Sequence, residues 1–477
     1  MKFDVSKDLR QDEALDKWKR NKGVGCVNAC PRFGKTKIGL KLITKNRQIN
    51  PTSRIVILVP SEIIEAHWKQ QDINHTFEIY TSHKAKNNLR EISNSIIDIL
   101  IVDELHKFTS DENISLLIQL SKLSKFRLAL TGTYPSDNRV LSSWFPVVDT
   151  INEEEALEKG WISDFIEYNI PVPLTTKEKV KYGIYSEFIT QTLDLFKSKY
   201  KVINEGTNLL SDDLDLIYSC YTGKKYKGKY ISGEIFRELI AKHMGWNRDL
   251  DLSNTSNRER DIYWNPNNLY ERCKQFKQYV SRRNELLINN ENKLELLLYI
   301  CQQSPVPTII FNESTEFVNI IADKLGNKAI PYHSKIKSRP LIGEDGEIIK
   351  SKTGNPKMFG SIRLKKAAIE GINSGKYLYL VTVKSLDEGL DLPILEQVII
   401  TAGSANPLQQ LQRSARGKTI DGNNVNKLTR IFNLYIDDYI NNFGHLVRSR
   451  DKRKLIERQR NYTHSVKWIN SINDITL

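Results

Sequence analysis

The segment that most constrains the fold of this chain is Asn28–Thr36, which reads Asn-Ala-Cys-Pro-Arg-Phe-Gly-Lys-Thr. A short apolar run of strand type, Gly23–Val27, precedes it, and Lys37–Ile43 follows with apolar residues at helical spacing. A strand, a turn and a helix that begins with Gly-Lys-Thr are typical of a phosphate-binding loop. In such a loop, backbone N–H groups and the positive end of the helix dipole contact the phosphates. The sequence therefore predicts a nucleotide site at the start of an α/β domain.

Individual residues of this loop have separate tasks in the prediction. Gly34 would let the backbone approach a phosphate, Lys35 would reach the outer phosphates and Thr36 would ligate Mg²⁺. The usual pattern has glycine where this chain has Ala29, which is small enough to replace it if its φ stays negative. Upstream, the amide of Gln11 could read an adenine edge, although an ordinary exposed glutamine is the alternative. The residues predicted to contact the nucleotide here are Gln11, Ala29, Pro31, Arg32, Phe33, Gly34, Lys35 and Thr36.

Two adjacent carboxylates follow another apolar run. Ile96–Val102 is typical of a strand buried on both faces of a parallel sheet, and it leads directly into Asp103 and Glu104. Buried carboxylates are costly without a partner, and a bound Mg²⁺ and an attacking water would supply one. We expect Asp103 to hold the metal and Glu104 to act on the water, with His106 coupling the site to neighbouring loops. A helix N-cap with an acidic first turn is the alternative.

Two more strands are predicted in the first part of the chain. Arg54–Val59 ends at Pro60, and Ser61 could cap the helix that follows. Phe126–Leu130 ends in a small hydroxylic turn that could bond to the acidic site. The turn consists of Thr131, Gly132 and Thr133.

Composition narrows the functional class. The chain has 477 residues, enough for two or three domains, and a formal net charge of +14. The charge favours a polyanionic partner, most simply nucleic acid, over a lysine-rich solvated surface. Five scattered cysteines form no zinc pattern and fit a reducing cytosol. We see no signal peptide and no run of 18 apolar residues, so the sequence predicts no membrane span.

These segments, in this order, resemble the first RecA-like domain of superfamily 2 helicases and translocases. The second half continues the resemblance. Its matching segments are the strand Thr308–Phe311, Tyr332–Ser334, Arg363 with the following helix, Gly371–Gly375, Tyr377–Thr382, Ser385–Pro393 and Gln409–Gly417. The last of these is similar to motif VI, with Ala415 where the family usually has glycine. The resemblance implies two RecA-like domains, mainly parallel sheets flanked by helices, with ATP and Mg²⁺ bound between them.

The resemblance also implies roles for residues of the second half. Arg413 and Arg416 would be arginine fingers that bring positive charge to the γ-phosphate. Gly389 and Asp391 would help to link the nucleotide to the nucleic-acid track. Residues implied to contact nucleic acid are Pro60, Ser61, Thr131, Gly132, Thr133 and Thr382.

The expected domain organisation has four parts. Residues 1–168 would form the first RecA-like domain, and 169–290 a mainly helical insertion. In it Lys224–Tyr230 could contact nucleic acid or form a solvated loop. Residues 291–445 would form the second RecA-like domain, with a protruding β-hairpin insertion at 341–359 whose role could be strand separation or that of a passive loop. Residues 446–477 would be a basic helical extension. Within it Arg448–Arg460 would carry charge nearly all round, either as a solvated helix or as a nucleic-acid contact.

The expected activity is that of an ATP-dependent DNA helicase or translocase. Asp-Glu-x-His with Thr-Gly-Thr looks closer to DNA translocases than to Asp-Glu-Ala-Asp RNA helicases, and the whole is similar to phage-encoded, UvsW-like branch-migration helicases. We therefore expect a monomer that acts on DNA forks, branched junctions and duplex/single-strand boundaries in the cytoplasm, that of a bacterial host if the gene belongs to a phage. Two alternatives stay open. An RNA-directed helicase would be distinguished by the nucleic acid that stimulates its ATPase, and a non-catalytic clamp by the absence of hydrolysis.

Overall fold

The computed structural model describes residues 5–71, 77–199, 266–333, 335, 339–340, 358–359, 361–383, 392–403, 405–420, 424, 427–441, 443–460, 462 and 464–475. The chain divides into two compact units. Unit 1 comprises Met1–Val172, Lys293–Tyr435 and Arg450–Leu477, and unit 2 comprises Pro173–Asn292 and Ile436–Ser449. The six- and seven-stranded sheets of the described residues both belong to unit 1.

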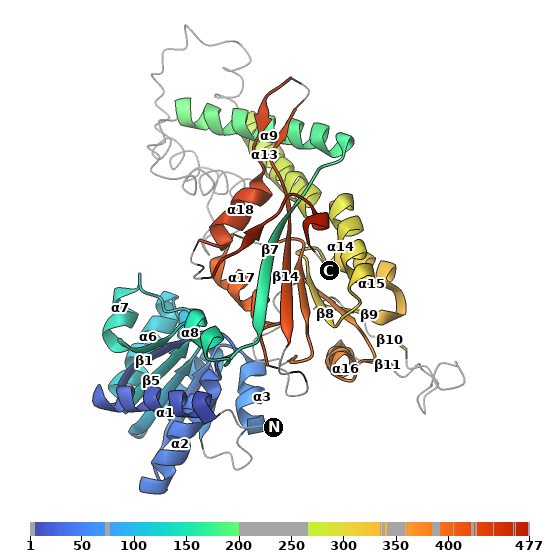
Figure 1. Cartoon of the computed structure of the whole chain (residues 1–477). Helices are drawn as coiled ribbons and strands as arrows, with labels where there is room; N and C mark the ends of the chain where they lie inside the picture. The colour runs from blue at the N-terminus through green and yellow to red at the C-terminus, as the bar shows by residue number, and fades with distance from the viewer. Residues whose placement is uncertain are drawn as a thin grey trace, which may run out of the picture. The chain divides into compact units, whose positions relative to one another are not determined.

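The first sheet has the strand order β3-β2-β4-β5-β1-β6, and every pairing in it is parallel. Helices α1, α2 and α3 cover one face around Trp18, Leu42 and Trp68, while α6 and α7 cover the other around Leu117 (Figure 1). Because both faces are covered, the central strands are apolar throughout. The elements are α1 (Val5–Arg20), β1 (Val24–Ala29), α2 (Lys35–Ile49), β2 (Ile55–Val59), α3 (Glu62–Gln71), β3 (Glu78–Thr81), α4 (Ser82–Asn87), α5 (Leu89–Ile92), β4 (Ile97–Asp103), a 3₁₀ turn (Leu105–Lys107), α6 (Asp111–Lys122), β5 (Ser124–Thr131), α7 (Arg139–Trp144), β6 (Val147–Ile151) and α8 (Glu153–Glu158).

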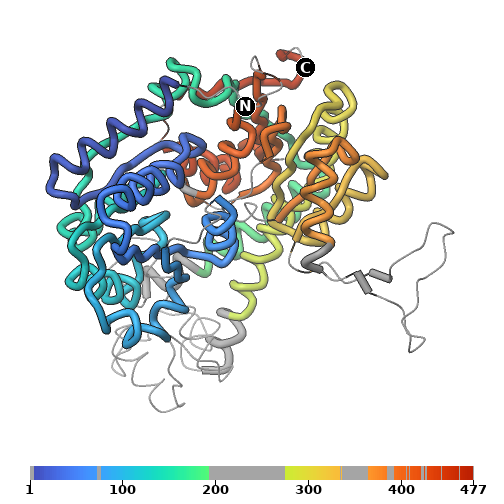
Figure 2. The backbone as a smooth tube through the Cα atoms, turned by 90° about the horizontal axis from the view of Figure 1, so that it is seen from below, coloured from blue at the N-terminus to red at the C-terminus, as the bar shows by residue number. Residues whose placement is uncertain are grey.

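The second sheet has the strand order β17-β7-β14-β13-β8-β12-β9. Its pairings from β14 to β9 are all parallel, and so is that of β17 with β7. Helices α15 and α16 pack against β9 and β12 (Figure 2). The prediction of two parallel α/β sheets is thus confirmed. The elements are β7 (Asp164–Val172), α14 (Glu291–Gln303), β8 (Thr308–Phe311), α15 (Thr315–Leu325), a 3₁₀ turn (Gly326–Lys328), β9 (Ala329–Tyr332), α16 (Ser361–Asn373), β12 (Tyr379–Thr382), β13 (Gln397–Ile400), α17 (Pro407–Ser414), β14 (Leu428–Ile436), α18 (Arg450–Arg458), β17 (Lys467–Trp468) and a 3₁₀ turn (Ile472–Asp474).

The ends of the second sheet differ from the expected domain plan. β7 begins before residue 168 but pairs within the second sheet, and β17 joins the same sheet beside it. Within the described part of the basic segment the α-helix is α18, and that helix does not expose charge all round. Asp451, Leu455 and Arg458 are buried, and Lys293 bonds Asp451 at 2.6 Å. Charge spacing along the sequence could not show this face, because its partners lie on other elements.

Unit 2 contains the long helices α9 (Thr176–Lys199) and α13 (Pro266–Ile288), which pack together, and a short hairpin of β15 (Tyr439–Ile440) with β16 (Leu446–Val447). The predicted insertion at 341–359 lies mostly outside the described residues. Its ends are flanked by the antiparallel pair β10 (Arg339–Pro340) and β11 (Met358–Phe359). Lys224–Tyr230 also lies outside them. Of the helices that the structure describes, none combines the length and apolar character needed to cross a membrane.

Candidate nucleotide-binding site

The predicted phosphate loop connects β1 to α2. Gly34 has a φ of 98°, in the left-handed region that favours glycine, and Arg32 has a φ of 71°. A Cβ atom at Gly34 would lie 2.9 Å from Nε2 of Gln11, so the approach of the two residues requires glycine. Gln11 is buried, and its Nε2 donates a hydrogen bond to the carbonyl oxygen of Phe33 at 3.2 Å. Helix α1 therefore supports the loop through the residue that was predicted to contact adenine.

Ala29 stands where the usual loop pattern has glycine. It is the last residue of β1, pairs with Ile151 of β6 and has a negative φ. Its methyl group is buried in the core of the first domain. An extended strand residue does not need the conformational freedom of glycine, so the alanine is compatible with this loop.

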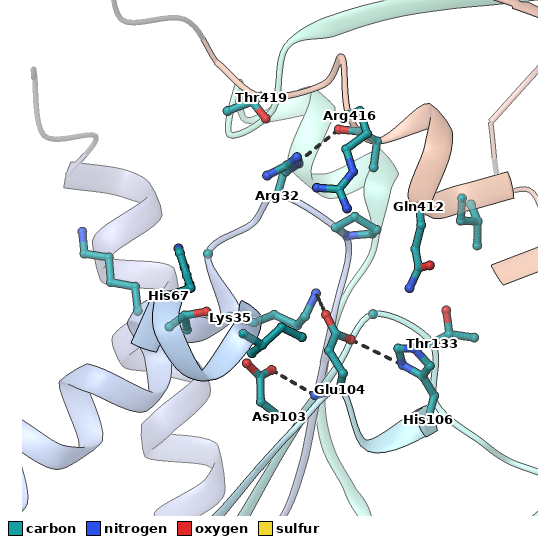
Figure 3. A pocket seen from close by; sticks show the side chains of 18 of the residues that line it. Arg32, Lys35, His67, Asp103, Glu104, His106, Thr133, Gln412, Arg416 and Thr419 are labelled. Carbon is teal, nitrogen blue, oxygen red and sulfur yellow. Dashed lines mark hydrogen bonds and ion pairs between the residues drawn. The ribbon is translucent and has the colours of Figure 1, made fainter. Parts of the chain in front are cut away.

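The acidic pair lies at the end of β4, opposite Lys35. The Nζ atom of Lys35 is 3.6 Å from Oε1 of Glu104. Glu104 has a φ of 52°, which is uncommon for a residue with a side chain and costs about 1–3 kcal/mol. Figure 3 shows the side chain of Glu104 extending between Lys35 and His106. Backbone strain of this kind is typical of functional sites.

Asp103 is buried and held by two hydrogen bonds. Its Oδ2 accepts from the indole Nε1 of Trp68 at 2.8 Å, and its Oδ1 accepts from the backbone N–H of Glu104 at 2.9 Å. Burial and the neighbouring charge of Glu104 raise the pKa of Asp103. A divalent cation at this carboxylate would oppose that rise. The indole of Trp68 packs so closely on α2 that a Cβ at Gly39 would lie 2.5 Å from it.

A chain of polar contacts links the acidic pair to the turn after β5. The Nδ1 atom of His106 lies 3.4 Å from Oε2 of Glu104 and 2.9 Å from Oγ1 of Thr131. Thr131 in turn donates to the carbonyl oxygen of Thr133 at 2.9 Å. The hydroxylic turn therefore reaches the acidic pair through His106, which contacts both Thr131 and Glu104.

These groups surround one cavity of about 380 Å³ within unit 1. Figure 3 shows Lys35 extending toward Glu104 and Arg416 pointing into the same space. The predicted residues that line the cavity from the loop are Pro31, Arg32, Gly34, Lys35 and Thr36. From the ends of β4 and β5 come Asp103, Glu104, His106, Gly132 and Thr133. The second domain contributes Leu411, Gln412, Ala415, Arg416 and Thr419.

The two predicted arginine fingers take different positions. Arg416 lines the cavity together with Lys35. Arg413 is not among the lining residues: it is 1% exposed, and its guanidinium donates to the carbonyl oxygens of Ala402 and Val383 at 2.9 and 3.4 Å. Burial lowers the pKa of Arg413 to about 10. The structure thus brings one of the two arginines to the cavity, while Arg413 joins strand ends of its own domain.

Several features fit a nucleotide with a metal ion. The Oε1 atom of Gln11 is buried and has no hydrogen-bond partner among the described residues. A buried acceptor left in this state is costly, and the exocyclic amino group of adenine is a donor that would satisfy it. Thr36 and Asp103 line the cavity, and the described residues hold no cluster of three or more His, Cys, Asp or Glu that could form a metal cage. Mg²⁺ fits such a sparse protein shell because it usually keeps waters and takes substrate phosphates.

The remaining predicted residues lie elsewhere. Pro60 and Ser61 follow β2, and the Ser61 hydroxyl accepts from the N–H of Ile64 at 3.5 Å at the start of α3. Thr382 is buried at the end of β12, and Phe33 is buried behind the loop. None of these four is a lining residue of the cavity, and contact of the first three with nucleic acid stays a prediction. Gly389 and Asp391 lie outside the described residues.

Sequence reasoning missed the contribution of α3. Ile64, His67 and Gln71 of this helix line the cavity, and Trp68 binds Asp103. The signal available was a tryptophan on the helix after β2, a position that is ordinarily core. The contact between Nε1 of Trp68 and the acidic pair, 35 positions away, depends on the strand order of the sheet.

Comparison with known protein families matches part of the second half of the chain. Residues 292–418 match the family described as the helicase conserved C-terminal domain. No curated protein matches the chain.

Solved structures similar to the chain include the Hef helicase domain of Pyrococcus furiosus, at 13% identity and a TM-score of 0.48 over 91% of this chain and 95% of that one. A fragment of a putative HsdR subunit of a type I restriction enzyme from Vibrio vulnificus has 12% identity and a TM-score of 0.49, covering 90% of this chain and 63% of that one. S. cerevisiae Dbp5 bound to RNA and ADP BeF3 has 11% identity and a TM-score of 0.48, covering 97% of this chain and 90% of that one. These likenesses are too slight to assign a substrate. The family match over residues 292–418, on a chain with two parallel α/β domains, supports a nucleotide-dependent helicase.

Proposed function

We propose that this chain is an ATP-dependent DNA helicase or translocase. The observation that carries the proposal is that Lys35 of the first parallel domain and Arg416 of the second line one cavity with the acidic pair. Phosphoryl transfer needs positioning and positive charge around the γ-phosphate more than covalent chemistry. The phosphate loop and Arg416 supply these two requirements from separate domains, so that binding and hydrolysis of one nucleotide can change their spacing.

The roles follow from the contacts. Lys35 and the N-terminus of α2 would hold the phosphates, and Gln11 would accept a hydrogen bond from adenine. Glu104 would orient the attacking water, with His106 and Thr131 fixing its carboxylate. Thr36 and Asp103 would hold Mg²⁺, which neutralises phosphate charge when it is bound. Arg416 would stabilise the charge of the transition state.

The nucleic-acid partner is proposed from charge and motif type. A net charge of +14 favours a polyanion, and the resemblance of Asp-Glu-x-His with Thr-Gly-Thr to DNA translocases favours DNA. Forked and branched junctions processed by a monomer are the substrates that we propose, and RNA is an outcome of the test. ATPase stimulation and unwinding should be measured on a fork, a Holliday junction, a tailed duplex and a duplex RNA, with and without ATP. Stimulation by RNA alone would redirect the proposal.

The ATPase itself is tested with Lys35→Ala. Loss of a charge-assisted contact to phosphate costs about 1.5–3 kcal/mol, so nucleic-acid-stimulated hydrolysis should fall about 10–150-fold. Lys45→Ala is the matched control, because Lys45 lies on the same helix, pairs with Asp12 at 2.7 Å and does not line the cavity. Equal hydrolysis by the two variants would show that the cavity is not the ATPase site.

A further inference from the structure

A cluster of buried charges lies next to the turn that carries Arg416. The Nζ atom of Lys418 is fully buried, 2.6 Å from Oε1 of Glu153 on α8 and 3.5 Å from the centre of the Phe165 ring. The other oxygen of Glu153 lies 2.9 Å from Nδ1 of His464. The Nε2 atom of His464 lies 3.0 Å from Oε2 of Glu167 on β7. Three parts of the chain that are distant in sequence, at 153–167, 418 and 464, thus meet through one alternating row of charges.

The row ends on a fixed carboxylate. Oε1 of Glu167 accepts hydrogen bonds from Asn433 at 2.8 Å, Gln459 at 3.2 Å and Tyr462 at 3.3 Å. Burial acts to raise the pKa of Glu153, but the charges of Lys418 and His464 lower it to about 2. Burial also acts to lower the pKa of His464, and its close contacts with the two glutamates raise it. The arrangement therefore favours the charged form of each of these two groups.

The same turn is held from the first half of the chain by further contacts. Ser163 donates its N–H to the carbonyl oxygen of Lys418 at 3.0 Å and its hydroxyl to that of Thr419 at 2.9 Å. The Nε atom of Arg32, in the phosphate loop, donates to the carbonyl oxygen of Ala415 at 3.3 Å. Ala415 and Thr419 line the cavity on either side of Arg416 in sequence. The position of Arg416 therefore depends on a turn that is anchored at both ends.

We propose that Lys418, Glu153 and His464 are positioning residues that hold Arg416 at the nucleotide cavity. The inference rests on the proposed function. None of the three lines the cavity, so they act through the turn and not on the substrate. Displacement of a catalytic group by about 1 Å costs about a hundredfold in rate, which makes such an anchor worthwhile for catalysis. The buried pair alone is weak evidence for stability, because its Coulomb gain is offset by desolvation.

The experiment compares Lys418→Met with Arg416→Ala and the double variant in steady-state ATP hydrolysis. Lys418→Met should lower kcat about 10–100-fold and leave KM within about twofold. Lys418→Met should add little to Arg416→Ala, because both remove the same contribution. Lys293→Met is the matched control. It breaks another buried lysine–carboxylate pair, also 2.6 Å long, away from the cavity, and should leave kcat unchanged at a temperature where the protein is folded.

If the Lys418→Met protein fails to fold, two further variants test the same inference. Lys418→Arg keeps the charge and should restore most of kcat, while Glu153→Gln should repeat the kcat loss. In the wild type, kcat should decline as His464 loses its proton above pH 6.5, and His464→Gln should lack that decline. Additive effects of Lys418→Met and Arg416→Ala, or a change in KM alone, would overturn the inference. A wild type without Lys35-dependent hydrolysis would instead refute the proposed function, and the inference with it.

Discussion

Trp68 gives the sharpest single test of the metal site. The indole N–H donates one of the two hydrogen bonds that fix Asp103, and Trp68→Phe removes this donor while keeping an aromatic ring. A hydrogen bond to a charged group contributes about 1.5–3 kcal/mol, whereas one to a neutral group contributes about 0.5–1.5 kcal/mol. Loss of a residue that orients a metal ligand typically costs 10–100-fold in metal affinity. We therefore expect the Mg²⁺ concentration needed for half-maximal nucleotide binding to rise about 10–100-fold.

Trp18→Phe is the control for this prediction. The Trp18 indole is also buried and donates at the same distance, 2.8 Å, but to the carbonyl oxygen of Arg127 in the core. Both variants leave a similar void, so the difference between them isolates the bond to Asp103. Mg²⁺ titrations with a fluorescent ATP analogue and chemical denaturation should be run on both. Trp68→Phe should be about 1 kcal/mol less stable than Trp18→Phe, which should bind Mg²⁺ and nucleotide like the wild type.

An unchanged Mg²⁺ requirement in Trp68→Phe would refute the reasoning. So would an equal shift in Trp18→Phe, because it would show that any aromatic truncation in this core loosens the site.

The remaining predictions concern buried charges. Because the pKa of Glu153 in the folded state is about 2, below its ordinary 4.5, its contribution to stability is present above pH 4.5 and is lost as the pH falls toward 2. The gap in melting temperature between the wild type and Glu153→Gln should shrink over that range, and a gap that widens in acid would contradict the assignment. The pKa of His464 is raised above 6.5, so its contribution to folding stability is full below pH 6.5 and is lost at higher pH. The melting temperature of His464→Gln should therefore approach that of the wild type as the pH rises. Lys293→Met, which breaks the pair with Asp451, should lower the free energy of unfolding by about 3–5 kcal/mol in chemical denaturation. The double variant Lys293→Met with Asp451→Leu should lose less, because it leaves no unpaired buried charge. Additive losses in this last comparison would show that the two residues do not form a coupled pair.

The sequence was informative where chemistry is local. Gly34, Lys35 and the pair Asp103–Glu104 could be placed because each stands at the end of an apolar run, and parallel strands bring such ends to one edge of a sheet. The two arginines could be assigned to one motif, but which of them would face the cavity could not be predicted, because Arg413 lies on α17 (Pro407–Ser414) and Arg416 lies in the turn that follows it. Three positions separate Arg413 from Arg416, and Arg413 is the one whose guanidinium is bonded to carbonyl groups.

Contacts between distant segments could not be predicted. The pairing of Lys418 with Glu153 spans 265 positions, and no periodicity or motif marks either residue. The same holds for β7, whose apolar and polar residues read as a continuation of the first domain although the strand belongs to the second sheet. In each case the deciding information is a tertiary contact, which a window of local sequence does not contain.

The placement of β7 has a consequence for how the molecule is made on the ribosome. All six strands of the first sheet lie between Val24 and Ile151, so that domain can fold soon after this contiguous stretch has emerged. β7 follows at once, but its neighbour β14 is synthesised far later. Asn433, which donates a hydrogen bond to Glu167 of β7, is made 266 positions after it. During that interval β7 presents unpaired backbone groups and apolar side chains to whatever is nearby. Nascent-chain aggregation, and protection by chaperones, should therefore concentrate on the period between the synthesis of these two strands.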